Sequence, residues 1–463
     1  MTAANNIETA STTIRTFFNK EEIQEVARST KFVQRYSPLN GFIFLQAIIF
    51  AFIADPEANL DDLAQACADL GVEISIQGFD QRLNPYTVEF LKEMLSRAMA
   101  QFKNNSPLPL PLLQQFRAIN LVDSTVIALP DNMATEFPGC GGDGPQASLK
   151  IQLKFEFLHG NLSQIVLQGG KEPDQNFEAY LQQVQAGSLN INDLGYFVLA
   201  NFKTIDQEKE AYYLSRYLFG TRVLTGAEDP IDLGTMLKKA SRQPCELEVL
   251  LGAKEKLPCR LICIPLPQEV ADRRRQKAKE KARRQGKNLS QAYLGLLDWL
   301  IFVTNVPHEM LSIEQVALLY RVRWQIELVF KLWKSYCGLD HIQGLRRERV
   351  LCELYAKMIG IILTQFLLAP LRMPQGPWAN REISSFKVRD IFQRFALELM
   401  RSLPQLDALE AVLAHLFKRI ERFGLKQKRS KSPNVCHALA LASVVYILEF
   451  EFDQNIELPS LLA

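Results

Sequence analysis

The sequence lacks the features that mark several classes of protein. No two of its eight cysteines are spaced two residues apart, and its five histidines do not have the spacing of a zinc finger. The cysteines are scattered singly along the chain, which favours free thiols in a reducing compartment over a disulfide framework. No strong internal repeat is present, so a solenoid is not expected.

Long apolar runs and a leader segment are also missing. The N-terminus reads MTAANNIETASTT and has no basic stretch before an apolar one, so we expect no signal peptide. The apolar runs Phe42–Ala54 and Met358–Leu371 are too short to cross a bilayer and are predicted to be core helices. We therefore expect a cytoplasmic protein with no membrane partner.

Net charge and the glycine-rich stretch argue against two further classes of protein. A net charge of only +2 argues against a uniformly basic nucleic-acid binder, although it allows local basic patches. The glycine-rich stretch Pro138–Pro145 lacks the GK[ST] ending of a phosphate loop, so nucleotide binding is not expected. A chain of 463 residues is too long for one core, and we expect two to four domains.

The N-terminal part has a helical pattern that includes a candidate DNA-binding motif. A capped helix is predicted over Leu60–Leu70, a tight turn at Gly71, and a second short helix over about Ser75–Leu83. This order is consistent with a helix-turn-helix, in which Gln81 and Arg82 would touch DNA. The alternative is an ordinary helical hairpin.

Strands replace helices after the proline-rich stretch SPLPLPLL. The pattern predicts three antiparallel strands, a helix and a fourth strand, over Ala118–Pro130, the hairpin Ser148–Gly170, Gln175–Gln185 and Ser188–Leu199. This order matches a ribonuclease H-like core. Single acids lie in the first and the last strand, Asp123 and Asp193. Taken alone, Asp123 could be a strand-end acid at the surface, and Asp193 could begin a turn.

The fifteen residues Tyr320–Lys334, YRVRWQIELVFKLWK, predict a helix with one polar side. At 100° per residue, five polar side chains share an arc of about 80°; they are Tyr320, Arg323, Glu327, Lys331 and Lys334. The rest of the helix is mostly apolar, so we expect it to be buried, with the polar arc facing a cleft. The alternative is a solvated row of charge pairs one turn apart.

This stretch resembles the catalytic helix of bacterial DDE transposases of the insertion-sequence-four family. The family signature is a tyrosine, an arginine three residues later, a glutamate four residues after that, and a lysine seven residues further on. It matches at Tyr320, Arg323, Glu327 and Lys334. The family's first two acids lie in settings similar to Asp123-Ser124-Thr125 and to the DLGYF that begins at Asp193.

The resemblance implies the chemistry. Asp123, Asp193 and Glu327 would bind two Mg²⁺ ions, for which Mn²⁺ can substitute. The enzyme would cleave and join the ends of its insertion sequence, by cut-and-paste with a hairpin intermediate. Its partners would be double-stranded DNA ends, target DNA and a second copy of the chain, in the bacterial nucleoid. Two alternatives stay open: a metal-dependent nuclease of the same fold, and an inactive relative that only binds DNA.

Further residues are predicted to contact DNA. The basic side chains of the arc and Tyr320 would hold phosphates of the DNA end. Nine of the sixteen residues of Asp272–Lys287 are Lys or Arg, which predicts an exposed helix that contacts phosphates; the residues expected to do so are Arg273, Arg274, Arg275 and Lys277. The alternative is a solvated charge run. Trp299 would stack on an extruded base, or else fill a core as an ordinary buried aromatic.

Together these patterns predict an α/β protein, with a ribonuclease H-like catalytic core, a β-rich insertion, and helical domains at both ends. The expected boundaries are 1–105 for a DNA-binding helical domain, 106–211 and 301–370 for the two parts of the core, 212–300 for the insertion, and 371–463 for a helical domain. The family resemblance implies that this last domain would pair two copies.

Overall fold

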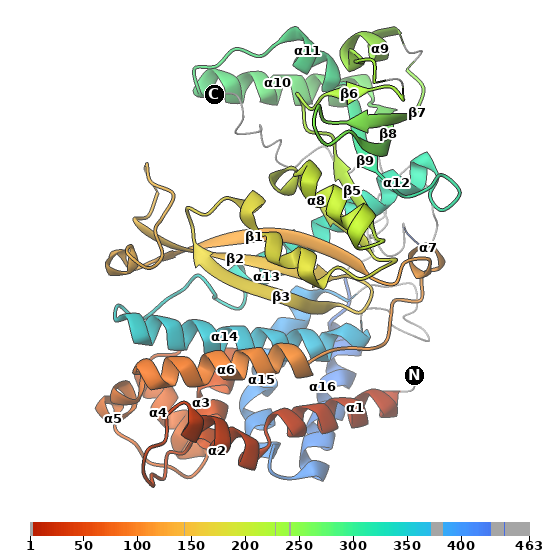
Figure 1. The fold of residues 1–463 in the computed structure, drawn as a ribbon. Helices are drawn as coiled ribbons and strands as arrows, with labels where there is room; N and C mark the ends of the chain where they lie inside the picture. Colours follow the sequence, from red (N-terminus) through yellow and green to blue (C-terminus); the bar gives the residue numbers. More distant parts are fainter. Residues whose placement is uncertain are drawn as a thin grey trace.

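The structure, a computed structural model, describes residues 3–142, 144–226, 228–239, 242–371, 383–426 and 439. Within these ranges the chain is a mixed α/β protein, with one nine-stranded sheet and helices from both ends of the chain beneath it (Figure 1). The predicted α/β class with flanking helices is therefore confirmed. The basic stretch KQKRSK at Lys426–Lys431 lies outside the described residues beyond Lys426.

The sheet has the strand order β3-β2-β1-β4-β5-β9-β8-β7-β6. β1, β2 and β3 are antiparallel neighbours, whereas β4 runs parallel to β1, and β5 runs parallel to β4. The strands are β1 (Ile119–Leu129), β2 (Ala147–Glu156), β3 (Asn161–Gly169), β4 (Leu189–Asn192), β5 (Tyr212–Arg216), β6 (Val223–Leu224), β7 (Cys245–Leu251), β8 (Leu257–Pro265) and β9 (Trp299–Thr304).

The register of two central strands places two acids next to each other. β1 and β4 are parallel, and Val122 lies opposite Asn192. The next residues along these strands are Asp123 and Asp193. Asp193 follows the end of β4 instead of lying within a strand, and a short 3-10 turn, η4 (Leu194–Tyr196), begins directly after it.

The helix predicted over Gln175–Gln185 is wrong. The segment forms two 3-10 turns, η2 (Asp174–Asn176) and η3 (Glu178–Gln183). Phe177 separates them with a non-helical backbone, φ −79° and ψ 61°. This break lets the Phe177 ring enter the core beside Tyr180, with ring centroids 5.7 Å apart, so burial of the aromatic rings overrides local helix propensity.

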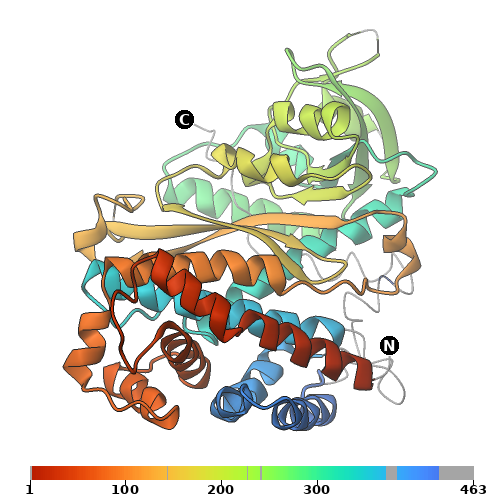
Figure 2. The same cartoon turned by 60° about the horizontal axis from the view of Figure 1, so that its bottom comes forward.

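The helices from the two ends of the chain form one body below the sheet, as both Figures 1 and 2 show. α3 packs on α15, and α1 packs on α16 and α6, so the N- and C-terminal helices share a single core. These helices are α1 (Ala3–Phe17), α2 (Lys20–Ser29), α3 (Gly41–Ala54), α4 (Leu60–Asp69), α5 (Ile76–Arg82), α6 (Pro85–Gln101), α14 (Arg347–Leu368), α15 (Ser385–Ser402) and α16 (Leu406–Phe423).

Local chemistry sets where the N-terminal helices begin. Asn59 caps α4 and forms a reciprocal capping box with Asp62. Gly71 then adopts a φ of +81°, which favours glycine, and the turn leads into α5. The order of helix, tight turn and short helix predicted from the sequence is therefore present.

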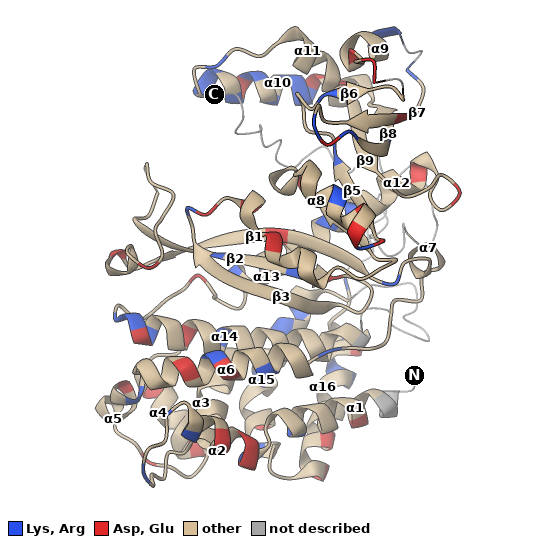
Figure 3. Cartoon of the chain, viewed as in Figure 1, with Lys and Arg blue, Asp and Glu red and all other residues tan. Residues whose placement is uncertain are grey.

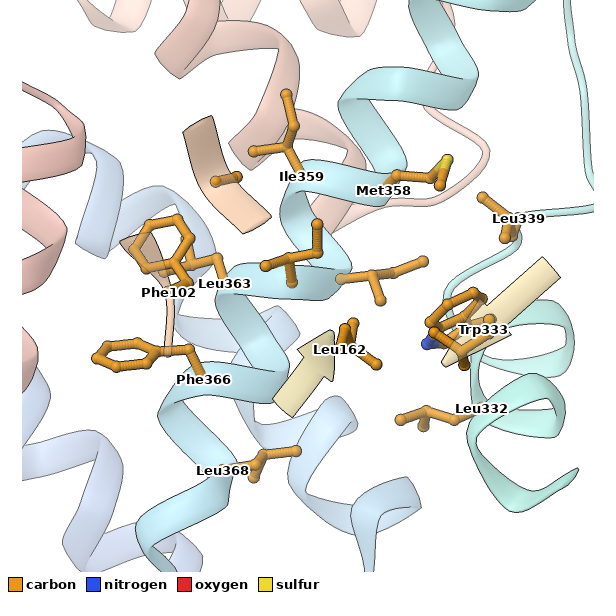
Figure 4. Close-up of a cluster of buried hydrophobic side chains, with 14 of the residues drawn as sticks. Phe102, Leu162, Leu332, Trp333, Leu339, Met358, Ile359, Leu363, Phe366 and Leu368 are labelled. Atoms are coloured by element: carbon orange, nitrogen blue, oxygen red, sulfur yellow. The ribbon is translucent and has the colours of Figure 1, made fainter. Parts of the chain in front are cut away.

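α14 is the central core helix of the lower body. It is long and apolar enough to cross a membrane, but 94% of its most apolar window is buried inside the protein, as expected of a core helix. Side chains from α14, β3 and α13 (Trp324–Ser335) meet in one apolar layer (Figure 4). Trp333 of α13 is only 1% exposed in this layer, which anchors α13 behind the sheet.

The chain between β5 and β9 extends the sheet and adds helices. β6, β7 and β8 continue it, while α10 (Gln268–Arg284) and α11 (Gln291–Leu296) lie at its far end with α9 (Leu233–Lys239) (Figure 1). An apolar cluster that includes Leu251 and Leu261 of this part also contains Val122 of β1 and Tyr213 of β5, so the extension shares one core with these two strands. The remaining short helices are α7 (Pro111–Gln114), α8 (Leu199–Lys203) and α12 (Ile313–Tyr320).

Candidate active site

Three carboxylates from distant parts of the chain surround one guanidinium, that of Arg323. Its Nη2 lies 2.6 Å from Oε1 of Glu327, its Nη1 3.7 Å from Oδ2 of Asp123, and its Nε 3.8 Å from Oδ1 of Asp193. The structure therefore brings together the three acids that the sequence singled out.

Three elements position these acids. Asp123 lies in β1 and Asp193 directly after the neighbouring β4, while α13 packs against β1 and carries the glutamate. The predicted helix Tyr320–Lys334 is not one α-helix: α12 ends at Tyr320, a 3-10 turn, η6, spans Arg321–Arg323, and α13 begins at Trp324. Arg323 is the residue before α13, and Glu327 lies one helical turn later.

Burial and the closeness of the three carboxylates shift the pKa values of the site. Burial raises the pKa of Asp123 to about 7. Arg323 and the Ser124 N–H oppose this rise, whereas Asp193 and Glu327 add to it. Burial acts to lower the pKa of Arg323, but the neighbouring carboxylates and Tyr320 raise it on balance, so the guanidinium stays charged.

The donor set suits a hard divalent cation. All three side chains offer carboxylate oxygens, without nitrogen or sulfur donors, as Mg²⁺ and Mn²⁺ prefer. In the described part of the chain, no three His, Cys, Asp or Glu side chains converge closely enough to hold a metal ion. Asp123, Asp193 and Glu327 instead share the protein's own cation, Arg323.

The predicted polar arc does not face one cleft. Tyr320 is only 3% exposed, and the centroids of its ring and the Phe302 ring lie 5.1 Å apart. The Arg323 guanidinium carbon lies 6.0 Å from the centroid of the Tyr320 ring. Lys334 donates from Nζ to the carbonyl of Val126 at 2.7 Å. Lys331 lies over the ring of Phe386 in α15. The expectation that Tyr320 lines a cleft and holds a DNA phosphate is corrected, because packing between helix and sheet buries its side chain.

Trp299 lies in the core of the sheet extension. It is 6% exposed, packs in the same apolar cluster as Ile301, and pairs through its backbone with Pro265 of β8. Its carbonyl accepts a hydrogen bond from Arg274 at 3.1 Å. The structure therefore places Trp299 as a buried aromatic, and its ring is not presented for stacking on a base.

The basic segment forms the predicted helix, α10, along which Lys and Arg gather (Figure 3). Only part of it faces solvent. Arg273 and Lys277 are exposed, whereas Arg274 is 8% exposed and bonded to the Trp299 carbonyl. Arg275 is paired with Asp298 and Asp272. The predicted phosphate contacts of Arg274 and Arg275 are corrected, since the helix needs one side to pack on the sheet extension.

The two polar residues of the helix-turn-helix prediction differ in their surroundings. Gln81 is exposed near the end of α5. Arg82 donates from Nη2 to the hydroxyl of Ser37 at 2.6 Å, and burial together with Arg35 lowers its pKa. Gln81 is therefore the freer of the two to meet a ligand.

The sequence analysis missed a fourth acid, Asp174, beside the site. Its Oδ1 accepts hydrogen bonds from Ser124, Lys150 and Gln152. The sequence signal for this buried network was the alternation of polar and apolar residues in β2. Its polar positions 148, 150, 152, 154 and 156 are all buried. A polar face of this kind is usually read as solvent-exposed, so the buried network could not be recognised from the alternation alone.

Comparison with known proteins identifies the family of the chain. Residues 114–363 match a family described as a transposase DDE domain. The chain is similar to the transposase for insertion sequence element IS231F of Bacillus thuringiensis subsp. israelensis, with 29% identity over 91% of this chain and 93% of the relative. It is also similar to the transposase for insertion sequence element IS1151 of Clostridium perfringens, with 26% identity over 93% and 96%.

A solved structure with a similar course of chain is that of the piggyBac transposase in a synaptic complex with hairpin DNA. The likeness has a TM-score of 0.47 and 10% identity, and covers 92% of this chain and 87% of the other.

Proposed function

Because this chain belongs to the transposase DDE domain family and is an enzyme of DNA cleavage and transfer, we propose that it cleaves and joins the ends of an insertion sequence by two-metal phosphoryl transfer. The proposed site is Asp123, Asp193 and Glu327. The observation that carries the proposal is the meeting of these three carboxylates at Arg323, within 4 Å of one guanidinium. The printed names of the similar proteins, transposases for insertion sequence elements, support the choice of substrate.

The strand order supports a ribonuclease H-like core. Antiparallel β3-β2-β1 followed by parallel β4 and β5 is the order expected of that fold. β5 pairs with β4 and therefore belongs to this core, so we place the insertion between Arg216 and Trp299 instead of beginning it at residue 212. The other proposed divisions are 1–105 and 371–463, and the helices described within these two ranges share one packed body.

Two divalent ions, Mg²⁺ or in its place Mn²⁺, would be held by the three carboxylates, and when bound they activate a water or 3′-hydroxyl and stabilise the leaving oxygen. The protein's own groups prepare for this. Arg323 holds the carboxylates close despite their mutual repulsion. Lys334 donates to the Val126 carbonyl, three residues along β1 from Asp123, and we propose that its ammonium contacts DNA phosphate there.

The DNA would be held by surfaces away from the acids. We propose that the exposed Arg273 and Lys277 of α10 contact phosphates, and that Gln81 on α5 touches the insertion-sequence end. A hairpin intermediate, cut-and-paste transfer to target DNA, and a homodimer on the DNA complete the proposal, with the bacterial nucleoid as the site of action.

The test is the joining of a labelled insertion-sequence end to plasmid DNA in the presence of Mg²⁺. A transposase gives labelled plasmid, and a nuclease of the same fold gives cut ends without joined product. A relative that only binds DNA shifts the labelled end in a gel and leaves it whole. Either of the last two results overturns the proposal.

A further inference from the structure

We propose that Asp174 is a positioning residue of this site, which holds the segments of Asp123 and Asp193 in a fixed relation. The inference rests on the proposed function, since it concerns how those two acids are kept in place. Asp174 lies at the start of η2, in the chain that returns from β3 toward β4.

The first link runs from Asp174 to β1. Its Oδ1 accepts a hydrogen bond from the Ser124 hydroxyl at 2.8 Å. The backbone N–H of Ser124 in turn donates to Oδ1 of Asp123 at 2.8 Å. Ser124 thus connects Asp174 with Asp123. Its hydroxyl is held by Asp174, and its backbone N–H orients the Asp123 carboxylate.

The second link runs from Asp174 to β2. The same Oδ1 accepts from Lys150 Nζ at 2.9 Å and from Gln152 Nε2 at 3.3 Å. Gln152 lies directly opposite Ser124 in the antiparallel pair, so donors from two neighbouring strands meet on one carboxylate oxygen. Tyr196, the last residue of the turn after Asp193, donates its hydroxyl to Oε1 of Gln152.

The third link is a close packing of turns. η2, which begins at Asp174, packs against η4, which follows Asp193 directly. A Cβ added to Gly195 in η4 would lie 3.5 Å from Oδ2 of Asp174, so the Asp174 carboxylate closely approaches this turn. Asp174 therefore touches the strand of the first aspartate and the turn of the second.

Asp174 also has a purely structural part to play, which the experiment must separate. Lys150 is buried, with 10% of its side chain exposed, and Asp174 is the acid paired with it. Lys150 donates to the Glu172 carbonyl as well, at 2.6 Å. Removing the Asp174 charge leaves a buried ammonium without its ion-pair partner, which is destabilising on its own.

A pair of compensating variants separates positioning from stability. In Asp174→Asn the buried Lys150 loses its counter-charge, and in Asp174→Asn with Lys150→Met that ammonium is also removed. We expect the single variant to melt earlier and the double variant to recover most of the melting temperature. Ser124→Ala removes only the link to β1, and Glu172→Gln, an exposed acid in the segment just before η2, is the matched control.

The readouts are Mn²⁺ affinity by titration calorimetry, and kcat and KM for nicking of a labelled DNA end. For the double variant and for Ser124→Ala, we expect Mn²⁺ binding weakened about tenfold or more and kcat lowered with KM little changed. Both should keep a melting temperature close to that of the wild type, and Glu172→Gln should match the wild type throughout. These results would show that Asp123 and Asp193 are still present in the variants but are no longer held in the position that binds metal.

Two results overturn the inference. If the double variant regains Mn²⁺ affinity and kcat together with its melting temperature, Asp174 serves only as the counter-ion of Lys150. Wild-type affinity and kcat in Ser124→Ala would remove the link through Ser124. Asp123→Asn in the same titration keeps the proposed function distinguishable: unchanged Mn²⁺ binding there would refute the metal site itself, whatever Asp174 does.

Discussion

The guanidinium of Arg323 lies 2.6 Å from the Glu327 carboxylate, one helical turn before it, and the same group reaches both Asp123 and Asp193. This single cation lies among three acids that would otherwise repel one another. It gives the protein a way to fold with an acidic site in place before any metal ion arrives.

Arg323 should therefore stabilise the metal-free protein. We expect Arg323→Gln to lower the free energy of unfolding in EDTA by about 3–5 kcal/mol, because three partly buried carboxylates lose their shared counter-charge. Urea unfolding measures the change. Arg323→Lys keeps the charge and should lose less, whereas equal unfolding curves for wild type and Arg323→Gln would contradict this role.

Asp123 should have the opposite effect on stability, with a defined pH dependence. Its folded pKa is raised from 3.8 to about 7, so the folded state favours the protonated carboxyl. Stability from this group is present below the unfolded pKa and is lost as the pH rises through 7. We expect Asp123→Asn to be more stable than wild type at pH 8 in EDTA by about 4 kcal/mol, because the raised pKa corresponds to about 1.4 kcal/mol for each of about three pKa units, and no more stable at pH 4. A gain that is equal at both pH values would show that charge is not its cause.

The two sides of α10 should behave differently. Neutralising the exposed Arg273 and Lys277 to Gln should reduce the slope of log K against log salt for DNA binding by about two units, one for each lost phosphate contact. Arg274→Gln should instead lower the melting temperature, because its guanidinium bonds the buried Trp299 carbonyl. An unchanged salt slope in the first variant would make the exposed side a solvated charge run.

Trp299 should act as a core residue. Trp299→Ala is expected to cost about 3–5 kcal/mol of stability, and nicking, hairpin formation and reopening should fall in parallel. Trp299→Phe keeps part of the buried aromatic surface and should retain more of the stability and more of the activity than Trp299→Ala. Loss of hairpin formation alone, with an intact melting temperature, would restore the stacking role that the structure does not support.

The sequence predicted what depends on local pattern. Alternation and capping predict β1, the hairpin of β2 and β3, and the capped α4. The acids Asp123, Asp193 and Glu327 are singled out through the family resemblance. The predictions from sequence were wrong where tertiary packing determines the local structure. The burial of Tyr320 and Trp299 depends on which neighbours cover them, and the broken helix at Phe177 depends on where its ring is buried.

Two further features depend on contacts between distant segments. Asp174 meets Ser124 across 50 residues, and the buried polar face of β2 looks like an exposed one in sequence. The N- and C-terminal helices share a core through contacts such as that of the Ser11 hydroxyl with Glu410. Chain separation hides such contacts from any local pattern.

The central claim is that Asp123, Asp193 and Glu327 together carry the strand cleavage, and cleavage of a labelled insertion-sequence end in Mg²⁺ tests it most directly. Asp123→Ala, Asp193→Ala and Glu327→Gln should each abolish cleavage while binding of the DNA end stays largely intact, because affinity comes mostly from basic contacts. Glu25→Gln, an exposed acid on α2, is the control and should cut normally. Cleavage near the wild-type rate by any of the three variants would contradict the account.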